Sequence, residues 1–281
     1  MADNKMESFT TQITFARREN PVLETEKAYV LDYIAGPDIP RTNIEVESVE
    51  NIQVQDFRKD PLSLEKNGIT VAELVTSMEY ADFADDQKVQ TCFLEEAKAC
   101  LKDVLQANDV YVIDYEIRRR HATFPRSTGV PYDAAQPIVV AHGDFTPRDA
   151  SQRLRDQFSK DAEAKAERPF QFFNFWKPLR GPVRDWPLAV CDPSTVDPKR
   201  DILHVDNVCT DRIGEVFNLH HSPSQRWYYL SHQQESEAWV FNGYDSRKKG
   251  QYGVPHCAVQ CPTDGSSAPR ESIEIRGVAF F

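Results

Sequence analysis

The sequence has no long apolar run and no excess of basic residues. Its mean hydropathy is −0.56, and no stretch approaches the ~18 apolar residues that a membrane-spanning helix needs, so we expect no membrane insertion. The start, MADNKMESFTTQ, has neither the basic region nor the apolar core of a signal peptide, which predicts a cytoplasmic protein. The net charge of −11 argues against a nucleic-acid partner, because phosphates attract a basic face.

The sequence also lacks the paired C-x2-C spacing of structural zinc sites, although it contains six cysteines. In a cytoplasmic protein we expect these cysteines to be reduced. Cys257 and Cys261 closely follow His256, so a zinc site of the form His-Cys-x3-Cys is an alternative. Because no second cysteine pair lies nearby, this pattern is a weak indication of zinc.

What the sequence does contain is a series of short alternating segments separated by turn residues. Over residues 108–281 these segments, among them PIVVAH, PFQFFNFW and SIEIRGVAFF, predict a mainly-β core with flanking helices, a double-stranded β-helix of the jelly-roll, cupin-like type. Residues 1–75 predict an N-terminal β segment, in which TNIEVESVENIQVQDFR fits a half-buried strand pair. Residues 80–107 predict a helix that packs across one sheet, and residues 148–168 predict a helical excursion that could form a lid. No low-complexity linker divides the chain, so we expect one domain over residues 1–281.

Two His-x-Asp triplets could each supply a metal site together with His256. His142 and Asp144 end the buried-strand pattern PIVVAHGDFT, and the glycine between them leaves room for a ligand. His204 and Asp206 lie in a more charged stretch that suits a surface histidine, although their spacing to His256 fits a compact jelly roll better. Two imidazoles and one carboxylate, with open positions left over, form the facial set of non-haem Fe(II) oxygenases. Local context therefore favours His142, Asp144 and His256 as metal ligands.

A single Arg-x-Ser, formed by Arg270 and Ser272, follows His256 on the last alternating segment. A hairpin with PTDGSSAP as its turn would return Arg270 to the cavity of His256. The guanidinium group matches a carboxylate bidentately, which predicts a dicarboxylate co-substrate at Arg270 and Ser272. Arg276 is the alternative carboxylate binder, and a surface arginine on the final strand is the purely structural explanation.

Three segments of the chain resemble a known family. They are PFQFFNFWKPLRGPVRDWPLAVCD, RWYYLSHQQESEAWVFNGYDS and VPHCAVQCP…APRESIEIR, and the similarity extends to VESVENIQVQDFR near the start. On these segments the chain is identified as a member of the fungal hydroxylase/desaturase family of the CmcJ, AsaB and NvfI type, which includes a gibberellin desaturase and meroterpenoid endoperoxygenases. In that family the His-x-Asp triplet precedes the Asn-x-Trp-x-Pro segment, which implies His142 and Asp144 rather than His204.

The resemblance implies a dioxygenase that uses Fe(II), 2-oxoglutarate and O₂. It implies hydroxylation, desaturation or endoperoxide formation on a mostly apolar secondary metabolite, as in fungal meroterpenoid synthesis. Arg270 and Ser272 would then bind 2-oxoglutarate, and Trp176, Phe145 and Thr146 are candidates for the substrate pocket. The expected partner is a small molecule, and a homodimer is left open. A redox-neutral, metal-dependent cupin isomerase and a non-catalytic jelly-roll binding protein are the alternative functions.

Overall fold

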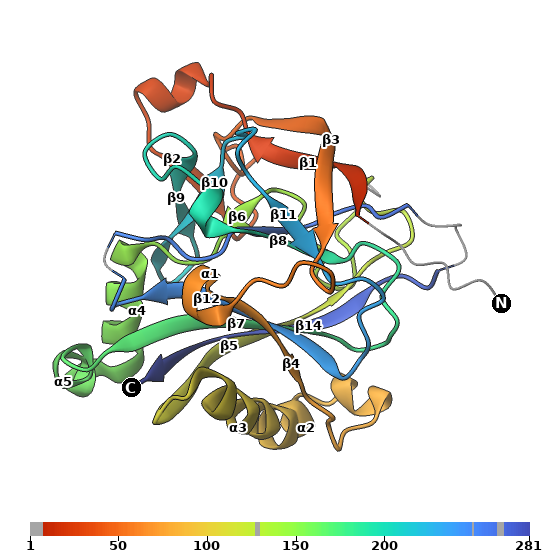
Figure 1. Ribbon diagram of the computed structural model, residues 1–281. Helices are drawn as coiled ribbons and strands as arrows, with labels where there is room; N and C mark the ends of the chain where they lie inside the picture. The colour runs from red at the N-terminus through yellow and green to blue at the C-terminus, as the bar shows by residue number, and fades with distance from the viewer. Residues whose placement is uncertain (1–7, 127–129, 249, 263–266) are drawn as a thin grey trace.

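Two facing β-sheets form the body of the molecule (Figure 1). The structure is a computed structural model that describes residues 8–126, 130–248, 250–262 and 267–281. Within these residues the larger sheet has nine strands and the smaller sheet has five, which confirms the predicted jelly roll. The larger sheet runs in the order β1 (Phe9–Ala16), β3 (Val46–Asp56), β11 (Trp227–Tyr229), β8 (Leu188–Cys191), β13 (His256–Ala258), β6 (His142–Gly143), β10 (Ile213–Leu219), β9 (Ile202–Val208) and β2 (Ala28–Leu31). The smaller sheet runs in the order β4 (Ile69–Glu73), β12 (Glu237–Asp245), β7 (Phe170–Pro178), β14 (Glu271–Phe280) and β5 (Asp109–Arg119).

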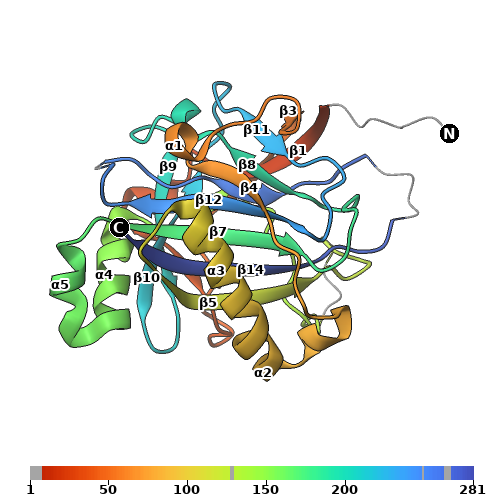
Figure 2. The same ribbon diagram turned by 60° about the horizontal axis from the view of Figure 1, so that its bottom comes forward.

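A helical layer covers the outer face of the smaller sheet (Figure 2). Its elements, within the segment 80–107, are the 3-10 turn η2 (Tyr80–Ala84), α2 (Asp86–Lys88), the π-helical turn η3 (Val89–Phe93) and α3 (Leu94–Leu105). The layer packs on outward-facing side chains of β7 and β14, among them Phe175 and Ile273. Because successive strand residues point to opposite faces, their neighbours on β7 and β14 point inward, toward the larger sheet.

The N-terminal strands extend both sheets. β1, β2 and β3 belong to the larger sheet, whereas β4 lies at the edge of the smaller one. The strand pair predicted for TNIEVESVENIQVQDFR is wrong, because this segment forms the single strand β3, which pairs antiparallel with β1 and parallel with β11. Asn51 has a φ of 61° and lies where the register against β1 shifts. It therefore marks a bulge in a continuing strand, not the turn of a hairpin.

The segment 148–168 lies at one end of the sheets as α4 (Pro147–Phe158), η4 (Ser159–Asp161) and α5 (Ala162–Ala166), near the C-terminus (Figure 1). Ala150 and Leu154 of α4 are buried against Phe172 and Phe280 of the smaller sheet. The shorter helices are η1 (Pro21–Glu24), α1 (Leu64–Asn67) and η5 (Pro193–Thr195). None of the helices in the described part of the chain is long and apolar enough to cross a membrane.

Candidate metal centre

Two neighbouring strands of the larger sheet bring the histidines together. His142 on β6 and His256 on β13 are direct cross-strand partners, and their ring centroids lie 4.4 Å apart. Asp144 follows β6 immediately and is 7% exposed. Gly143, between His142 and Asp144, lies so close to Phe217 that an added Cβ would meet a ring carbon at 2.2 Å. The glycine is therefore required for β6 to lie against this part of the core.

The geometry of the three side chains fits a divalent metal. Each residue offers one ligand atom, and these atoms all lie within 4.8 Å of one another. The Nε2 atoms of His142 and His256 each lie 3.7 Å from one carboxylate oxygen of Asp144. Each imidazole uses Nδ1 to donate a hydrogen bond to a nearby backbone carbonyl, that of Val140 at 2.8 Å or that of Val254 at 3.1 Å. Those bonds place the proton on Nδ1 and leave the lone pair of Nε2 for a metal, as metal-binding histidines require.

The charge state of the triad also suits a metal. Burial lowers the pKa of His142 to about 4, and the neighbouring His256 adds to this effect, so the imidazole is neutral at pH 7. Burial alone would raise the pKa of Asp144, but His256, Arg276 and His142 outweigh it and hold the pKa below its usual value. Because an imidazole that binds a metal through its lone pair adds no charge, one carboxylate leaves a divalent cation with a net charge of about +1, which suits an anionic chelating co-substrate.

Asp144 is held by two residues of the smaller sheet. Asn174 on β7 donates its side-chain amide to Asp144 Oδ2. On β14, Arg276 Nη1 lies 3.6 Å from Asp144 Oδ1. Asn174 and Arg276 are cross-strand partners, so both side chains rise from the same inner face of the sheet. Each oxygen of the carboxylate therefore has a protein partner that fixes its orientation.

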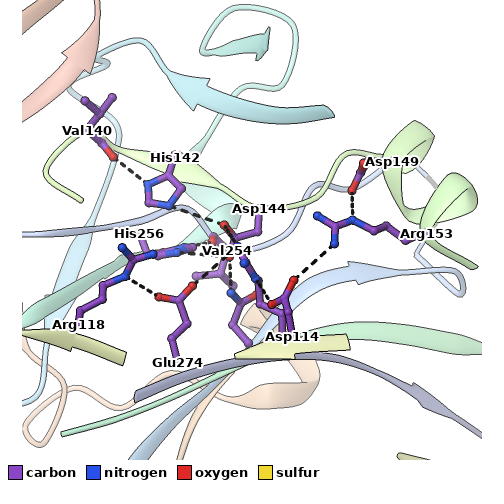
Figure 3. A network of polar contacts seen from close by, with 12 residues as sticks. Asp114, Arg118, Val140, His142, Asp144, Asp149, Arg153, Val254, His256 and Glu274 are labelled. Carbon is purple, nitrogen blue, oxygen red and sulfur yellow. Dashed lines mark hydrogen bonds and ion pairs between the residues drawn. The ribbon is translucent and has the colours of Figure 1, made fainter. Parts of the chain in front are cut away.

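An ion-pair network continues from Asp144 to the helical excursion (Figure 3). Arg276 Nε donates to Asp114 Oδ1 on β5 at 2.7 Å. Arg153 of α4 lies 3.5 Å from the other oxygen of Asp114 and donates to Asp149, one helical turn earlier, at 3.2 Å. The first two turns of α4 are thus connected to Asp144, a candidate metal ligand, through two arginines and one carboxylate.

Arg270 and Ser272 have buried polar atoms without a partner among the described residues. Arg270 is 5% exposed and Ser272 fully buried. Arg270 donates from Nη1 to the Trp186 carbonyl at 2.8 Å, but its Nε and the Ser272 hydroxyl find no hydrogen-bond partner in the part of the chain that the structure describes. Burial lowers the pKa of Arg270 to about 9, and the nearby Arg118 contributes, so this cation is short of compensating negative charge. Such atoms fit a carboxylate ligand, because an unsatisfied buried donor is costly.

Arg276, the alternative carboxylate binder, differs in that its charge is already compensated. Asp114 and Asp144 both contact its guanidinium group, and Glu274 lies 3.9 Å away. Burial would lower the pKa of Arg276, but these carboxylates raise it above its ordinary value. Arg270 is therefore the better partner for an incoming carboxylate. The predicted turn that precedes Arg270 lies partly in residues 263–266, outside the described residues.

The three candidates for the substrate pocket lie in different surroundings. Trp176 is 2% exposed on the inner face of β7, and the Arg270 guanidinium carbon lies 5.2 Å from its ring centroid. Phe145 is 1% exposed and packs against Phe172, with ring centroids 4.9 Å apart. Thr146 is fully buried and has a structural role, because its hydroxyl caps α4 and donates a hydrogen bond to Glu215 at 2.7 Å. Of the three, only Trp176 contacts a residue suited to co-substrate binding.

The structure does not bring the alternative ligands to the metal centre. His204 has a side chain that is 43% exposed and hydrogen-bonds to the Tyr252 hydroxyl at 2.6 Å. Its sequence neighbour Asp206 pairs with Lys27. Cys257 lies next to His256 on β13 and packs in the core on the opposite face of the larger sheet. In the part of the chain that the structure describes, the one metal-type cluster is His142, Asp144 and His256.

Sequence reasoning missed several polar residues around the centre, namely Asn174, Asp114 and the ion pair between Arg118 and Glu274 at 3.3 Å. Asn174 and Trp176 share one face of β7 because they are two positions apart. Glu274 and Arg276 share one face of β14 for the same reason. A polar residue at every second position of an otherwise buried strand is the signal that could have found these residues.

Comparisons with known proteins agree with the fold. The family model described as "Oxidoreductase/YMDC permease-like domain" matches residues 15–280. The chain is 31% identical over 230 residues to the Fe(II)/2-oxoglutarate-dependent dioxygenase nvfI of Aspergillus novofumigatus, covering 79% of this chain and 80% of that protein. It is 39% identical over 142 residues to aspirochlorine biosynthesis protein N of Aspergillus oryzae, covering 48% of this chain and 58% of that protein. A solved structure of the iron and alpha-ketoglutarate-dependent endoperoxidase NvfI superposes with a TM-score of 0.84 at 26% identity, covering 98% of this chain and 99% of the other.

The fold and the site together define a jelly-roll, metal-dependent oxidoreductase. The chain belongs to the family of fungal Fe(II)/2-oxoglutarate-dependent dioxygenases, so it is an enzyme that uses Fe(II), 2-oxoglutarate and O₂. The family predicted from the sequence is thereby confirmed, and the two alternative functions, a redox-neutral isomerase and a non-catalytic binding protein, are set aside.

Proposed function

We propose that this enzyme oxidises a small-molecule secondary metabolite with His142, Asp144 and His256 as the ligands of Fe(II). The observation that carries the assignment is the pair of hydrogen bonds from the histidine Nδ1 atoms to backbone carbonyls, because they direct both Nε2 lone pairs at one point beside Asp144. When bound, the iron with 2-oxoglutarate and O₂ supplies the oxidising power, and the protein supplies position and shelter from water.

We further propose that Arg270 and Ser272 hold the distal carboxylate of 2-oxoglutarate. Ser272, Glu274 and Arg276 share one face of β14 because they are at alternate positions, and Arg270 immediately precedes this strand. Since Arg276 contacts Asp144, this face leads from the carboxylate-binding end to the metal centre. Arg270 Nε and the Ser272 hydroxyl have no partner within the described residues and can donate to a carboxylate there.

The substrate is, on this proposal, a molecule with an apolar skeleton and polar substituents. The inner side of the smaller sheet is aromatic on β7 and β12, where Trp176, Trp239 and Phe241 lie. It is charged on β14 and β5, where Arg118 pairs with Glu274 and Asp114 pairs with Arg276. Two relatives of this enzyme are named for such oxidations, one as an endoperoxidase and one as a hydroxylase/desaturase. Hydroxylation, desaturation and endoperoxide formation are therefore the reactions to screen.

An anaerobic titration tests the site assignment. The metal-free protein is titrated first with Fe(II) and then with 2-oxoglutarate, and the visible metal-to-ligand charge-transfer band of the chelate is recorded. We expect the band to saturate at about one equivalent of each, as for a single facial site. His142→Ala should abolish iron binding, whereas the matched change His204→Ala should preserve it. Iron binding that survives in the first variant and fails in the second would refute the assignment.

A further inference from the structure

Lys177 is a buried amine that the proposed reaction does not use. It lies on β7 next to Trp176, and because strand residues alternate it points to the opposite face, toward the helical layer. It is 3% exposed. Its Nζ donates one long hydrogen bond, 3.5 Å, to the carbonyl of Pro178, and lies 5.8 Å from the Phe93 ring centroid. Among the described residues no carboxylate forms an ion pair with it, although buried lysines are normally paired.

Lys177 also lines a pocket of about 370 Å³ on this outer face of the sheet. Part of the pocket lining is apolar and includes Leu74, Met78 and Phe83. Ser236 offers a hydroxyl, and the carboxylates of Glu79 and Glu235 also line the pocket. These carboxylates disfavour an anionic occupant, whereas the apolar side favours a small neutral molecule. The amine is therefore next to a space that a neutral organic ligand can enter.

Burial favours the reactive form of the amine. It lowers the pKa of Lys177 from 10.5 to about 8, against the opposing influence of Glu235 and Glu96. At pH 7.5 about a quarter of such an amine is neutral, compared with about 0.1% of an ordinary lysine. A neutral lysine amine in a partly apolar pocket is the nucleophile that forms imines with carbonyl compounds.

We propose that Lys177 is a covalent binding site for small neutral aldehydes, which enter the pocket beside it and form an imine with its Nζ. The nitrogen lone pair attacks the carbonyl carbon, both protons of the neutral amine pass to the carbonyl oxygen, which leaves as water, and a C=N bond replaces the C=O bond. The step needs no oxidant or reductant. The site lies on the opposite face of the smaller sheet from His142, Asp144 and His256, so it is separate from the metal centre.

Reductive labelling of the full-length protein tests this site. The protein is incubated with butanal and cyanoborohydride at pH 7.5, which converts the imine to a stable secondary amine, and peptide mapping by mass spectrometry gives the rate at each lysine. The matched control within the same molecule is Lys98, whose side chain is 32% exposed and pairs with Glu95. We expect Lys177 to react at least tenfold faster than Lys98 at pH 7.5. The ratio should fall as the pH rises from 8 to 10.5, because an exposed lysine ordinarily gains neutral amine over that range.

Equal or slower labelling of Lys177 would overturn the proposal, whatever the state of the metal centre. A second arm uses Lys177→Arg, which keeps the charge but cannot form the imine under these conditions. It should lose the fast phase and keep the slow labelling of Lys98. A fast phase that persists in this variant would place the reaction at another residue. Addition of Zn(II) and 2-oxoglutarate should leave the fast phase unchanged, and protection by them would place the reaction at the metal centre instead.

Discussion

Replacement of Arg270 by Met is the most direct probe of how this enzyme recognises its co-substrate. Methionine fills much of the same buried volume but has no donor, so the variant removes the guanidinium group and leaves the Ser272 hydroxyl in place. A hydrogen bond to a charged group contributes about 1.5–3 kcal/mol. Since 1.4 kcal/mol is a tenfold change in affinity, we expect the Kd for 2-oxoglutarate to rise by about 10- to 150-fold.

The assay for Arg270→Met is the anaerobic 2-oxoglutarate titration of the iron-loaded protein, because it reports binding without a known substrate. Iron affinity, measured first, should change little, since Arg270 contacts Trp186 and Trp176 and none of the three metal-binding residues. Ser272→Ala should have a smaller effect, about fivefold, because it removes one neutral donor. An unchanged Kd in Arg270→Met, with a raised Kd in Arg276→Met and intact iron binding, would refute the reasoning.

Three further predictions concern the surroundings of the site. Asn174→Ala removes the donor to Asp144 Oδ2 and should lower iron affinity by about 10- to 100-fold, as measured by competition with a chelator; unchanged affinity would mean that Arg276 alone orients the carboxylate. Thr146→Ala removes the cap of α4 and the partner of buried Glu215, and should cost about 1–2 kcal/mol; hydrogen exchange should speed up in α4 and not in α3. Lys177→Met should stabilise the protein by up to about 3 kcal/mol at pH 7, because the folded-state pKa of this lysine is lowered to about 8 from 10.5. Between pH 8 and 10.5 the lysine is protonated in the unfolded chain and neutral in the folded one, so the stability of the wild type rises over this range and the advantage of the variant disappears. A difference in the free energy of unfolding that stays constant with pH would contradict this.

The sequence could predict the sheets and the identity of the clustered metal-type residues because both depend on local pattern. Alternation identified PIVVAH and SIEIRGVAFF as strands, and the end of the first strand placed His142 and Asp144 near each other. The distance from either triplet to His256 was not predictable from local pattern, since it depends on β6 and β13 pairing in the larger sheet. Spacing favoured His204, local context favoured His142, and the family resemblance decided for His142.

Other features could not be predicted because they depend on tertiary contacts. The hydrogen bond from Thr146 to Glu215 depends on the position of β10, a strand far along the chain. The contacts from Arg276 to Asp114 and Asp144 join three separate segments, and no spacing in the sequence encodes them. The single strand β3 was missed because alternation does not reveal whether a long segment continues or folds back, which depends on its pairing with β1 and β11.

The shortness of β6 and β13 has a consequence for stability. β6 has two residues and β13 has three, so few ladder hydrogen bonds hold these strands between β8 and β10. An ion bound to His142, Asp144 and His256 would join the two strands directly and act as a cross-link that closes a long loop of the chain. The metal would then contribute to holding the centre of the larger sheet together as well as to the chemistry, and iron limitation would lower the amount of folded enzyme in addition to its activity.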